Sequence, residues 1–183
     1  LPSKSLYENK IVKLNSDLDV NRDVLINKLF DLGYEKVPLV TKTGEMAIRG
    51  YVIDIFPIGI DNPIRIEFWG DTIDSIKYFD LDSQISNACV DEISIYPFTE
   101  FLLDNKNDID SKMFKQKYLP YYSKFVQGIW NYLGNYTLFY YDYNQIIEAY
   151  RLLRENIINY GNEINDSIKT NYMFDISDVK YNN

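Results

Sequence analysis

The residues best suited to chemistry in this 183-residue chain fall in one predicted strand, 64–69. Successive side chains of a strand alternate between its faces, so Arg65, Glu67 and Trp69 share one face and the apolar residues between them share the other. Arg49, in a preceding extended segment, could join that face. Arg and Trp are enriched among interface hot spots, and a guanidinium group can donate two parallel hydrogen bonds to a carboxylate. Arg49, Arg65, Glu67 and Trp69 could therefore form a protein-binding row, but the pattern alone favours ordinary solvated charges, with Trp69 packed under a loop.

Two carboxylates, Asp54 and Glu67, support an enzymatic alternative, in which they hold Mg²⁺ for a metal-dependent nuclease. Such sites usually carry a lysine two residues beyond the glutamate, but Trp69 occupies that position and the closest downstream lysine is Lys77. We therefore favour a structural interpretation of Asp54, as an acid at the end of a buried strand that pairs with an arginine or caps a turn.

The residue types that are missing exclude several classes of enzyme. The chain has no histidine and one cysteine, which excludes Cys/His zinc sites and nucleophiles activated by histidine. It also lacks the G-x-x-x-x-G-K-[ST] loop that cradles nucleotide phosphates. We expect no catalytic residue, no metal site, no cofactor and no ATPase activity.

Charge and composition favour a protein partner over nucleic acid. The formal net charge is −8, whereas unaided binding to duplex DNA needs basic surface to neutralise phosphates. Hydrophobic residues make up 46% of the chain, enough for a packed core. The lone Cys89, interpreted as a small buried hydrophobe, cannot form an intramolecular disulfide, which fits a reducing compartment.

The chain carries no signal pattern and no apolar stretch of the roughly 18 residues that a membrane span needs, so we expect a cytoplasmic protein without membrane contact. It opens at Leu1 without a methionine, from which we expect a piece of a longer protein. We expect this piece to be a monomer.

The predicted elements divide the chain into a β-rich module, 1–103, and a smaller α/β module, 104–183. In the first, Asn21 is expected to cap a helix over 22–32 that ends at Gly33. Gly70-Asp71 has the signature of a two-residue hairpin turn. The predicted strands are 8–14, 37–42, a long run over 45–56 with a bulge or bend at Gly50, 64–69, 72–79 and 92–96.

In the second module, Asp142 or Asn144 is expected to cap a helix that reaches about Tyr160 and stops at Gly161. An i, i+4 pair of Arg151 and Glu155 should support this helix. The other predicted elements are a linker over 104–110, a helix over 111–118 and strands over 137–141 and 172–176. One strand–helix–strand unit is too small to form an independent sheet, so we expect the second module to be part of a larger domain. The expected fold class of the chain is α+β.

Two strings then carry a family resemblance. The first is GEMAIRGYVIDIFPIG, from Gly44, and the second is IRIEFWGDTIDSIKYFDLDSQIS, from Ile64. They resemble a signature shared by UvrB and the bacterial transcription-repair coupling factors (Mfd), in which R-G and D-I-F-P are followed by R-x-E/D-F-F and F-D-x-x-x-Q. The DLDSQ wording is closer to Mfd, and a UvrB-type excinuclease subunit remains the alternative. The resemblance is strong over 1–100 and weaker beyond.

The resemblance implies a UvrB domain-2-like, mostly antiparallel UvrA-binding module followed by part of a degenerate helicase-like α/β domain. The family's contact positions fall on Arg49, Arg65, Glu67 and Trp69, with Trp69 standing where the family usually has Phe. Ala47 stands where some UvrB proteins carry a second arginine. Whole family members also engage RNA polymerase and DNA and translocate with ATP, but their motor motifs lie outside this chain. The DNA-inserting hairpin of UvrB has no counterpart that we can find.

Overall fold

The computed structural model describes residues 1–102, 127–137 and 139–163. The chain divides near residue 104 into two compact units, which are described separately here. Within the described ranges, no helix is long and apolar enough to span a lipid bilayer.

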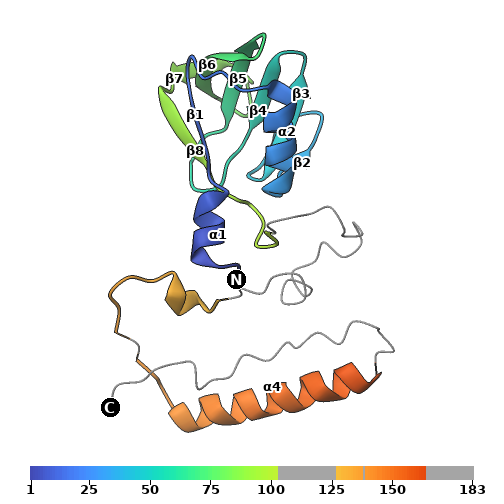
Figure 1. Cartoon of the computed structure of the whole chain (residues 1–183), viewed down its shortest axis with the longest axis vertical. Helices are drawn as coiled ribbons and strands as arrows, with labels where there is room; N and C mark the ends of the chain where they lie inside the picture. Colours follow the sequence, from blue (N-terminus) through green and yellow to red (C-terminus); the bar gives the residue numbers. More distant parts are fainter. Residues whose placement is uncertain (103–126, 138, 164–183) are drawn as a thin grey trace. The chain divides into compact units, whose positions relative to one another are not determined.

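The first unit contains a six-stranded sheet and a separate pair of strands (Figure 1). Neighbouring strands of the sheet pair antiparallel, apart from the first pair, which is parallel. In spatial order the sheet consists of β2 (Glu35–Lys36), β3 (Glu45–Arg49), β4 (Val52–Ile55), β5 (Ile64–Trp69), β6 (Thr72–Phe79) and β7 (Ser86–Cys89). The antiparallel pair consists of β1 (Val12–Asn15) and β8 (Glu92–Ile95), and the helices of this unit are α1 (Lys4–Asn9) and α2 (Arg22–Asp31).

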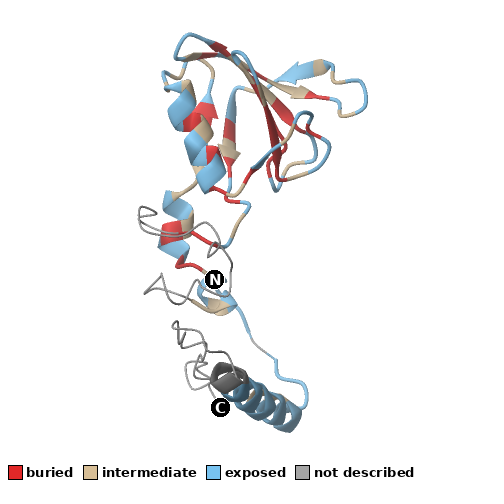
Figure 2. Cartoon of the chain, turned by 90° about the vertical axis from the view of Figure 1, so that its right-hand side faces the viewer, coloured by how far each residue is buried: buried red, intermediate tan, exposed pale blue. Residues whose placement is uncertain are grey.

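One face of the large sheet forms the main apolar core together with α2 and the β1–β8 pair. Burial follows the strand period: in β5, every second side chain is buried. The core includes Leu25 and Leu29 of α2, Ile53 and Ile55 of β4 and Ile64 and Ile66 of β5, with Leu14, Ile93 and Ile95 from the strand pair. Figure 2 shows the buried residues gathered in the strands and on the sheet-facing side of the helix. The opposite face of the sheet is thereby left for polar side chains.

A second, smaller apolar cluster lies apart from this core. It consists of Val40, Ala47, Phe56 and Phe79, with Val37 and Leu81 packed against it. Ala47 is paired with Asp54 across β3 and β4, so this cluster lies on the polar face of the sheet.

The predicted helix after Asn21 is confirmed, cap included. The Asn21 side chain accepts hydrogen bonds from the backbone N–H groups of Asp23 and Val24, at 3.1 Å each. Leu32 caps the other end and Gly33 follows with φ +91°, the left-handed conformation that glycine adopts easily. The Gly70-Asp71 hairpin is confirmed as well, because Trp69 pairs with Thr72 and Gly70 has φ +64°.

Three predicted strands of the first unit are wrong in part or in whole. The predicted strand 8–14 begins as α1 and becomes β1 only at Val12, because Ser3 caps a short helix through the N–H of Leu6. Residues 37–42 form no strand, and their neighbours 35–36 form β2 instead. The run 45–56 folds back on itself: Gly50, φ +57°, turns β3 into β4, and Arg49 pairs with Val52. The sequence analysis also missed β7.

The described part of the second unit holds a short 3₁₀ helix, η3 (Ile129–Asn131), and a long helix, α4 (Tyr143–Glu163). Asp142 caps α4 by accepting from the N–H of Gln145, and the Arg151–Glu155 pair is confirmed at 2.5 Å. The predicted stop at Gly161 is wrong, because the helix continues to Glu163, and the described residues of 137–141 form no strand. The linker over 104–110, the helix over 111–118 and the strand over 172–176 lie outside the described residues.

Replacement of Asn21 tests how much the cap of α2 contributes to the first unit. Asn21→Ala removes the acceptor of two backbone N–H groups and should lower the free energy of unfolding by about 1 kcal/mol. Asn21→Ser, which keeps an acceptor at the cap, should recover most of this loss. Urea unfolding followed by circular dichroism measures both, and equal losses for the two variants would contradict the capping role.

Candidate docking face

The four residues of the predicted row lie on one face of the large sheet, opposite the apolar core. Strand register places them there: Asp54 of β4 is paired with Arg65 of β5, and Val52 is paired with Glu67. Arg49 is paired with Val52 in turn, so it lies on the same face in β3. Trp69 follows the same alternation along β5, because Phe68 before it is buried and Trp69 is exposed, although the pairing with β6 shifts register between Glu67 and Phe68. The prediction that these side chains share a face is confirmed.

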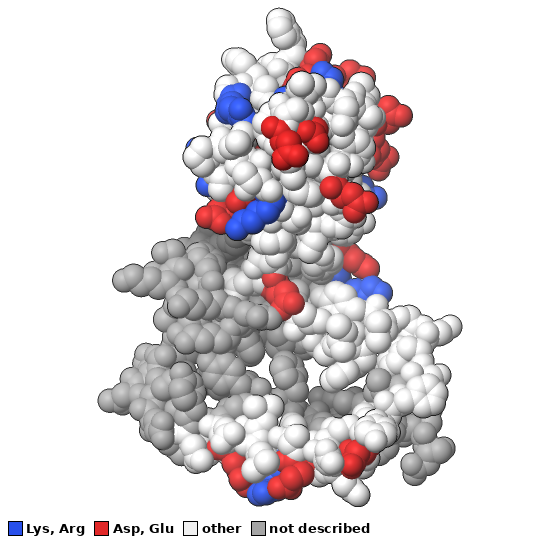
Figure 3. Space-filling view, turned by 180° about the vertical axis from the view of Figure 1, so that it is seen from behind, with Lys and Arg blue, Asp and Glu red and all other residues white. Residues whose placement is uncertain are grey.

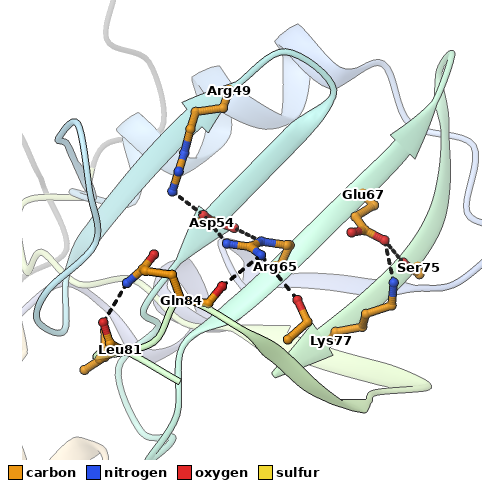
Figure 4. A network of polar contacts seen from close by, with 9 residues as sticks. Arg49, Asp54, Arg65, Glu67, Ser75, Lys77, Leu81 and Gln84 are labelled. Atoms are coloured by element: carbon orange, nitrogen blue, oxygen red, sulfur yellow. Dashed lines mark hydrogen bonds and ion pairs between the residues drawn. The ribbon is translucent and has the colours of Figure 1, made fainter. Parts of the chain in front are cut away.

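Asp54 lies between the two arginines of the row and is 1% exposed (Figure 4). One carboxylate oxygen accepts from Nε of Arg65 at 2.7 Å, and the other accepts from Nη2 of Arg65 at 3.0 Å. The second oxygen also accepts from Nη2 of Arg49 at 2.7 Å. The interpretation of Asp54 as a structural acid paired with an arginine is confirmed.

Arg65 has further partners inside the unit. Its Nη1 donates to the backbone carbonyl of Gln84 at 3.2 Å and to Oγ of Ser86 at 3.3 Å. Its guanidinium carbon lies 5.0 Å from the centre of the Phe79 ring, a cation–π distance. The hydrogen bond to Asp54 raises the pKa of Arg65. The side chain of Arg65 is 18% exposed. Arg65 is therefore bound to partners within the unit, whereas the sequence predicted an outward guanidinium group free to bind another protein.

A turn at residues 80–84 presents the Gln84 carbonyl to Arg65. Asp80 accepts from the N–H and the hydroxyl of Ser83, at 2.8 Å each, and Gln84 donates from its side chain to the carbonyl of Leu81. Gln84 itself has φ +60°, an uncommon conformation for a residue other than glycine. Sequence reasoning missed this role of the turn, although the string FDLDSQ contained every residue of it.

Glu67 forms a second ion pair on the same face. It accepts from Nζ of Lys77 at 2.6 Å and from the hydroxyl of Ser75 at 2.6 Å, both on β6. The hydrogen bond from Lys77 lowers the pKa of Glu67, and the same bond raises the pKa of Lys77. Glu67 and Lys77 are each about one-third exposed.

Trp69 is 82% exposed at the end of β5, so the alternative that it packs under a loop is wrong. Its strand end is nevertheless well fixed. The adjacent Asp71 accepts from the N–H of Val20 at 2.8 Å, and Thr72 donates its hydroxyl to Asp19 at 2.6 Å. The hairpin is thus tied to the loop before α2, and the indole projects from an ordered backbone.

These contacts argue against the alternative that Asp54 and Glu67 hold Mg²⁺ for a metal-dependent nuclease. Asp54 already accepts from two guanidinium groups and Glu67 from an ammonium group, so a Mg²⁺ ion would have to displace cations from both. In the part of the chain that the structure describes, no three histidine, cysteine or acidic side chains are grouped as metal ligands. Cys89, expected to be buried, is exposed on β7, because β7 forms the edge of the sheet.

Comparison with known proteins assigns this unit to a family. Residues 12–101 match the model of the UvrB interaction domain, which covers β1 through β8 and all four residues of the row. The first unit is similar to the UvrB interaction domain over these residues. The resemblance seen in the two sequence strings is thereby confirmed.

Curated proteins that are similar to this unit are named as transcription-repair-coupling factors. The chain is 36% identical over 103 residues to the transcription-repair-coupling factor of Staphylococcus aureus strain bovine RF122 / ET3-1, covering 56% of this chain and 9% of that protein. It is 35% identical over 98 residues to the transcription-repair-coupling factor of Staphylococcus haemolyticus, covering 54% and 8%. The chain therefore spans less than a tenth of the length of these relatives.

Loss of Arg65 should destabilise the UvrB interaction domain far more than loss of Arg49. Arg65→Ala removes both bidentate hydrogen bonds to the buried Asp54 and should lower the free energy of unfolding by about 3 kcal/mol. Arg49→Ala leaves the Arg65 pair intact, and Arg49 is half-exposed, so its loss should be below about 1 kcal/mol. Chemical unfolding of the two variants measures the difference, and similar losses would show that Asp54 does not depend on Arg65.

The Glu67–Lys77 pair should make the domain sensitive to acid. Because folding lowers the pKa of Glu67, its ionised form stabilises the fold above the ordinary glutamate pKa of 4.5, and this contribution is lost as pH falls below that value. The melting temperature of Glu67→Gln should lie below that of the wild type near neutral pH, and the gap should close in acid. Glu35→Gln, which removes an exposed carboxylate of β2, controls for net charge; a gap independent of pH would contradict this account.

Proposed function

We propose that this chain is the UvrA-binding module of a transcription-repair coupling factor, which recruits nucleotide excision repair to stalled transcription. The observation that carries the proposal is the match of residues 12–101 to the UvrB interaction domain, in a unit whose polar sheet face carries a half-exposed guanidinium group on β3 and an exposed indole at the end of β5. Relatives named as coupling factors favour this parent over a UvrB-type subunit. The role of the domain in this proposal is binding and not catalysis.

The docking face that we propose consists of Arg49, Arg65, Glu67 and Trp69. These four residues have different roles. Trp69 offers the largest exposed apolar surface of the four, suited to an apolar hollow on UvrA. Arg49 has nitrogen donors beyond its bond to Asp54 and suits an acidic side chain of UvrA. Arg65 and Glu67 hold the face in shape through their internal pairs.

The charge distribution supports a protein partner. In the view of Figure 3, acidic side chains are spread over the first unit, and the basic ones are isolated and do not form a stripe. Binding to a phosphate backbone needs a continuous basic surface. Contacts with DNA and RNA polymerase, and ATP-driven translocation, are therefore proposed for other parts of the parent protein. We also propose that the parent protein acts in the cytoplasm.

We propose further that the second unit is part of a degenerate helicase-like α/β domain. The 21-residue helix α4 supports this, because Leu152, Leu153 and Ile158 on it are about half-exposed. Apolar side chains of a helix are normally buried against neighbouring elements of the same domain.

Single substitutions on the face test the UvrA proposal. Arg49→Ala and Trp69→Ala should each weaken binding to UvrA from the same organism by about 2 kcal/mol, roughly 30-fold, as expected for central hot-spot side chains. Titration by isothermal calorimetry or surface plasmon resonance measures the change. Both residues are substantially exposed, so both variants should keep the fold.

Two residues of α2 provide matched controls, because this helix packs against the other face of the sheet. Lys28→Ala removes an exposed cation and Phe30→Ala removes a half-exposed aromatic ring. Both controls should bind UvrA like the wild type. Wild-type affinity of the Arg49 and Trp69 variants would refute the proposed face, and absence of binding by the unmodified chain would refute the function itself.

A further inference from the structure

We propose that Asp54, which is buried and cannot itself touch a partner, is the positioning residue of the docking face and holds the Arg49 guanidinium in the orientation that meets an acidic side chain of UvrA. This inference rests on the proposed function. It assigns a binding role to a residue that the sequence analysis interpreted as structural only.

The ion pairs around the row leave one positive charge in excess. Arg49, Arg65 and Lys77 contribute three positive charges to these pairs, and Asp54 and Glu67 contribute two negative ones. Glu67 is matched by Lys77, and the two oxygens of Asp54 are matched by the bidentate fork of Arg65. The positive charge left over belongs to Arg49, which is also the more exposed of the two arginines, 51% against 18%.

Arg49 is held at one edge only. Its one hydrogen bond in the described structure runs from Nη2 to an Asp54 oxygen at 2.7 Å, and that oxygen is shared with Arg65. A guanidinium group has five N–H donors in a rigid plane, so a single bond anchors one edge of the group and leaves most donors available. A partner carboxylate could bind these donors without breaking the bond to Asp54.

Asp54 itself is firmly held within the sheet. It is 1% exposed, it belongs to β4 at the centre of the sheet, and Arg65 ties it to β5 and, through Gln84 and Ser86, to the segment that enters β7. A long exposed arginine otherwise loses rotamer freedom on binding, and orientation in the free protein reduces that loss. Asp54 thus supplies a fixed reference to which the otherwise mobile Arg49 is attached.

A double-mutant cycle tests the role. Asp54→Asn should weaken UvrA binding by about threefold to tenfold, the factor that corresponds to the ordering of one side chain. In the Arg49→Ala background, Asp54→Asn should cause no further loss beyond about twofold, because the group that Asp54 orients is gone. An equal loss in both backgrounds, or no loss in either, would overturn the positioning role.

A second measurement does not depend on the folding of the Asp54 variant. Nitrogen-15 relaxation of the arginine Nε–H groups in the unmodified chain should show Arg49 nearly as ordered as Arg65, and clearly more ordered than Arg154, which is exposed on α4. An Arg49 as mobile as Arg154 would overturn the proposal. If the unmodified chain does not bind UvrA, the proposed function fails, whereas binding with an additive cycle refutes only the part played by Asp54.

Discussion

One buried carboxylate organises the polar side of this domain. Asp54 is almost fully shielded from water yet carries a formal charge, which is tolerable only because guanidinium groups from both neighbouring strands satisfy its oxygens. Arg65 extends this arrangement to the turn after β6 and to the start of β7. Strands β3, β4, β5 and β7 are therefore connected by side chains as well as by the backbone ladder, and Asp54 fixes where the two arginines of this face lie.

The two faces of the sheet have different roles, one in stability and the other in the proposed recognition of a partner. Isoleucines on one face pack with α2 and the β1–β8 pair into the main core, so that face is closed to partners. The other face carries ion pairs and ends in an indole that projects into solvent from a hairpin tied to the loop before α2. A rigid scaffold with an exposed aromatic group and a half-exposed, oriented guanidinium group is suited to binding a protein surface, because little order has to be created when the partner arrives.

Local signals in the sequence predicted several elements well. Asn21, the Gly70-Asp71 turn and the strands on either side of it were correct, since a cap, a hairpin turn and a two-residue period each depend on neighbouring residues. The errors arose where one local signal allowed two structures. Gly50 suits a bulge as well as a reverse turn, and only pairing of β3 with β4 selects the turn. At 37–42, Val37 and Val40 are apolar because they lie in or against the second cluster, and not because they form a strand.

For the candidate site, the sequence by itself determined which side chains share a face, because alternation along a strand is a local property of the backbone. It also placed an aspartate, two arginines and a tryptophan within the stretch that matches the UvrB interaction domain. Only the tertiary structure decided that Arg65 is turned inward and that Arg49 is half-exposed. That distinction depends on cross-strand register and on a turn nearly twenty residues away in the chain, which brings the Gln84 carbonyl to Arg65. Partners so distant in sequence are chosen by the packing of the whole sheet, which no local pattern encodes.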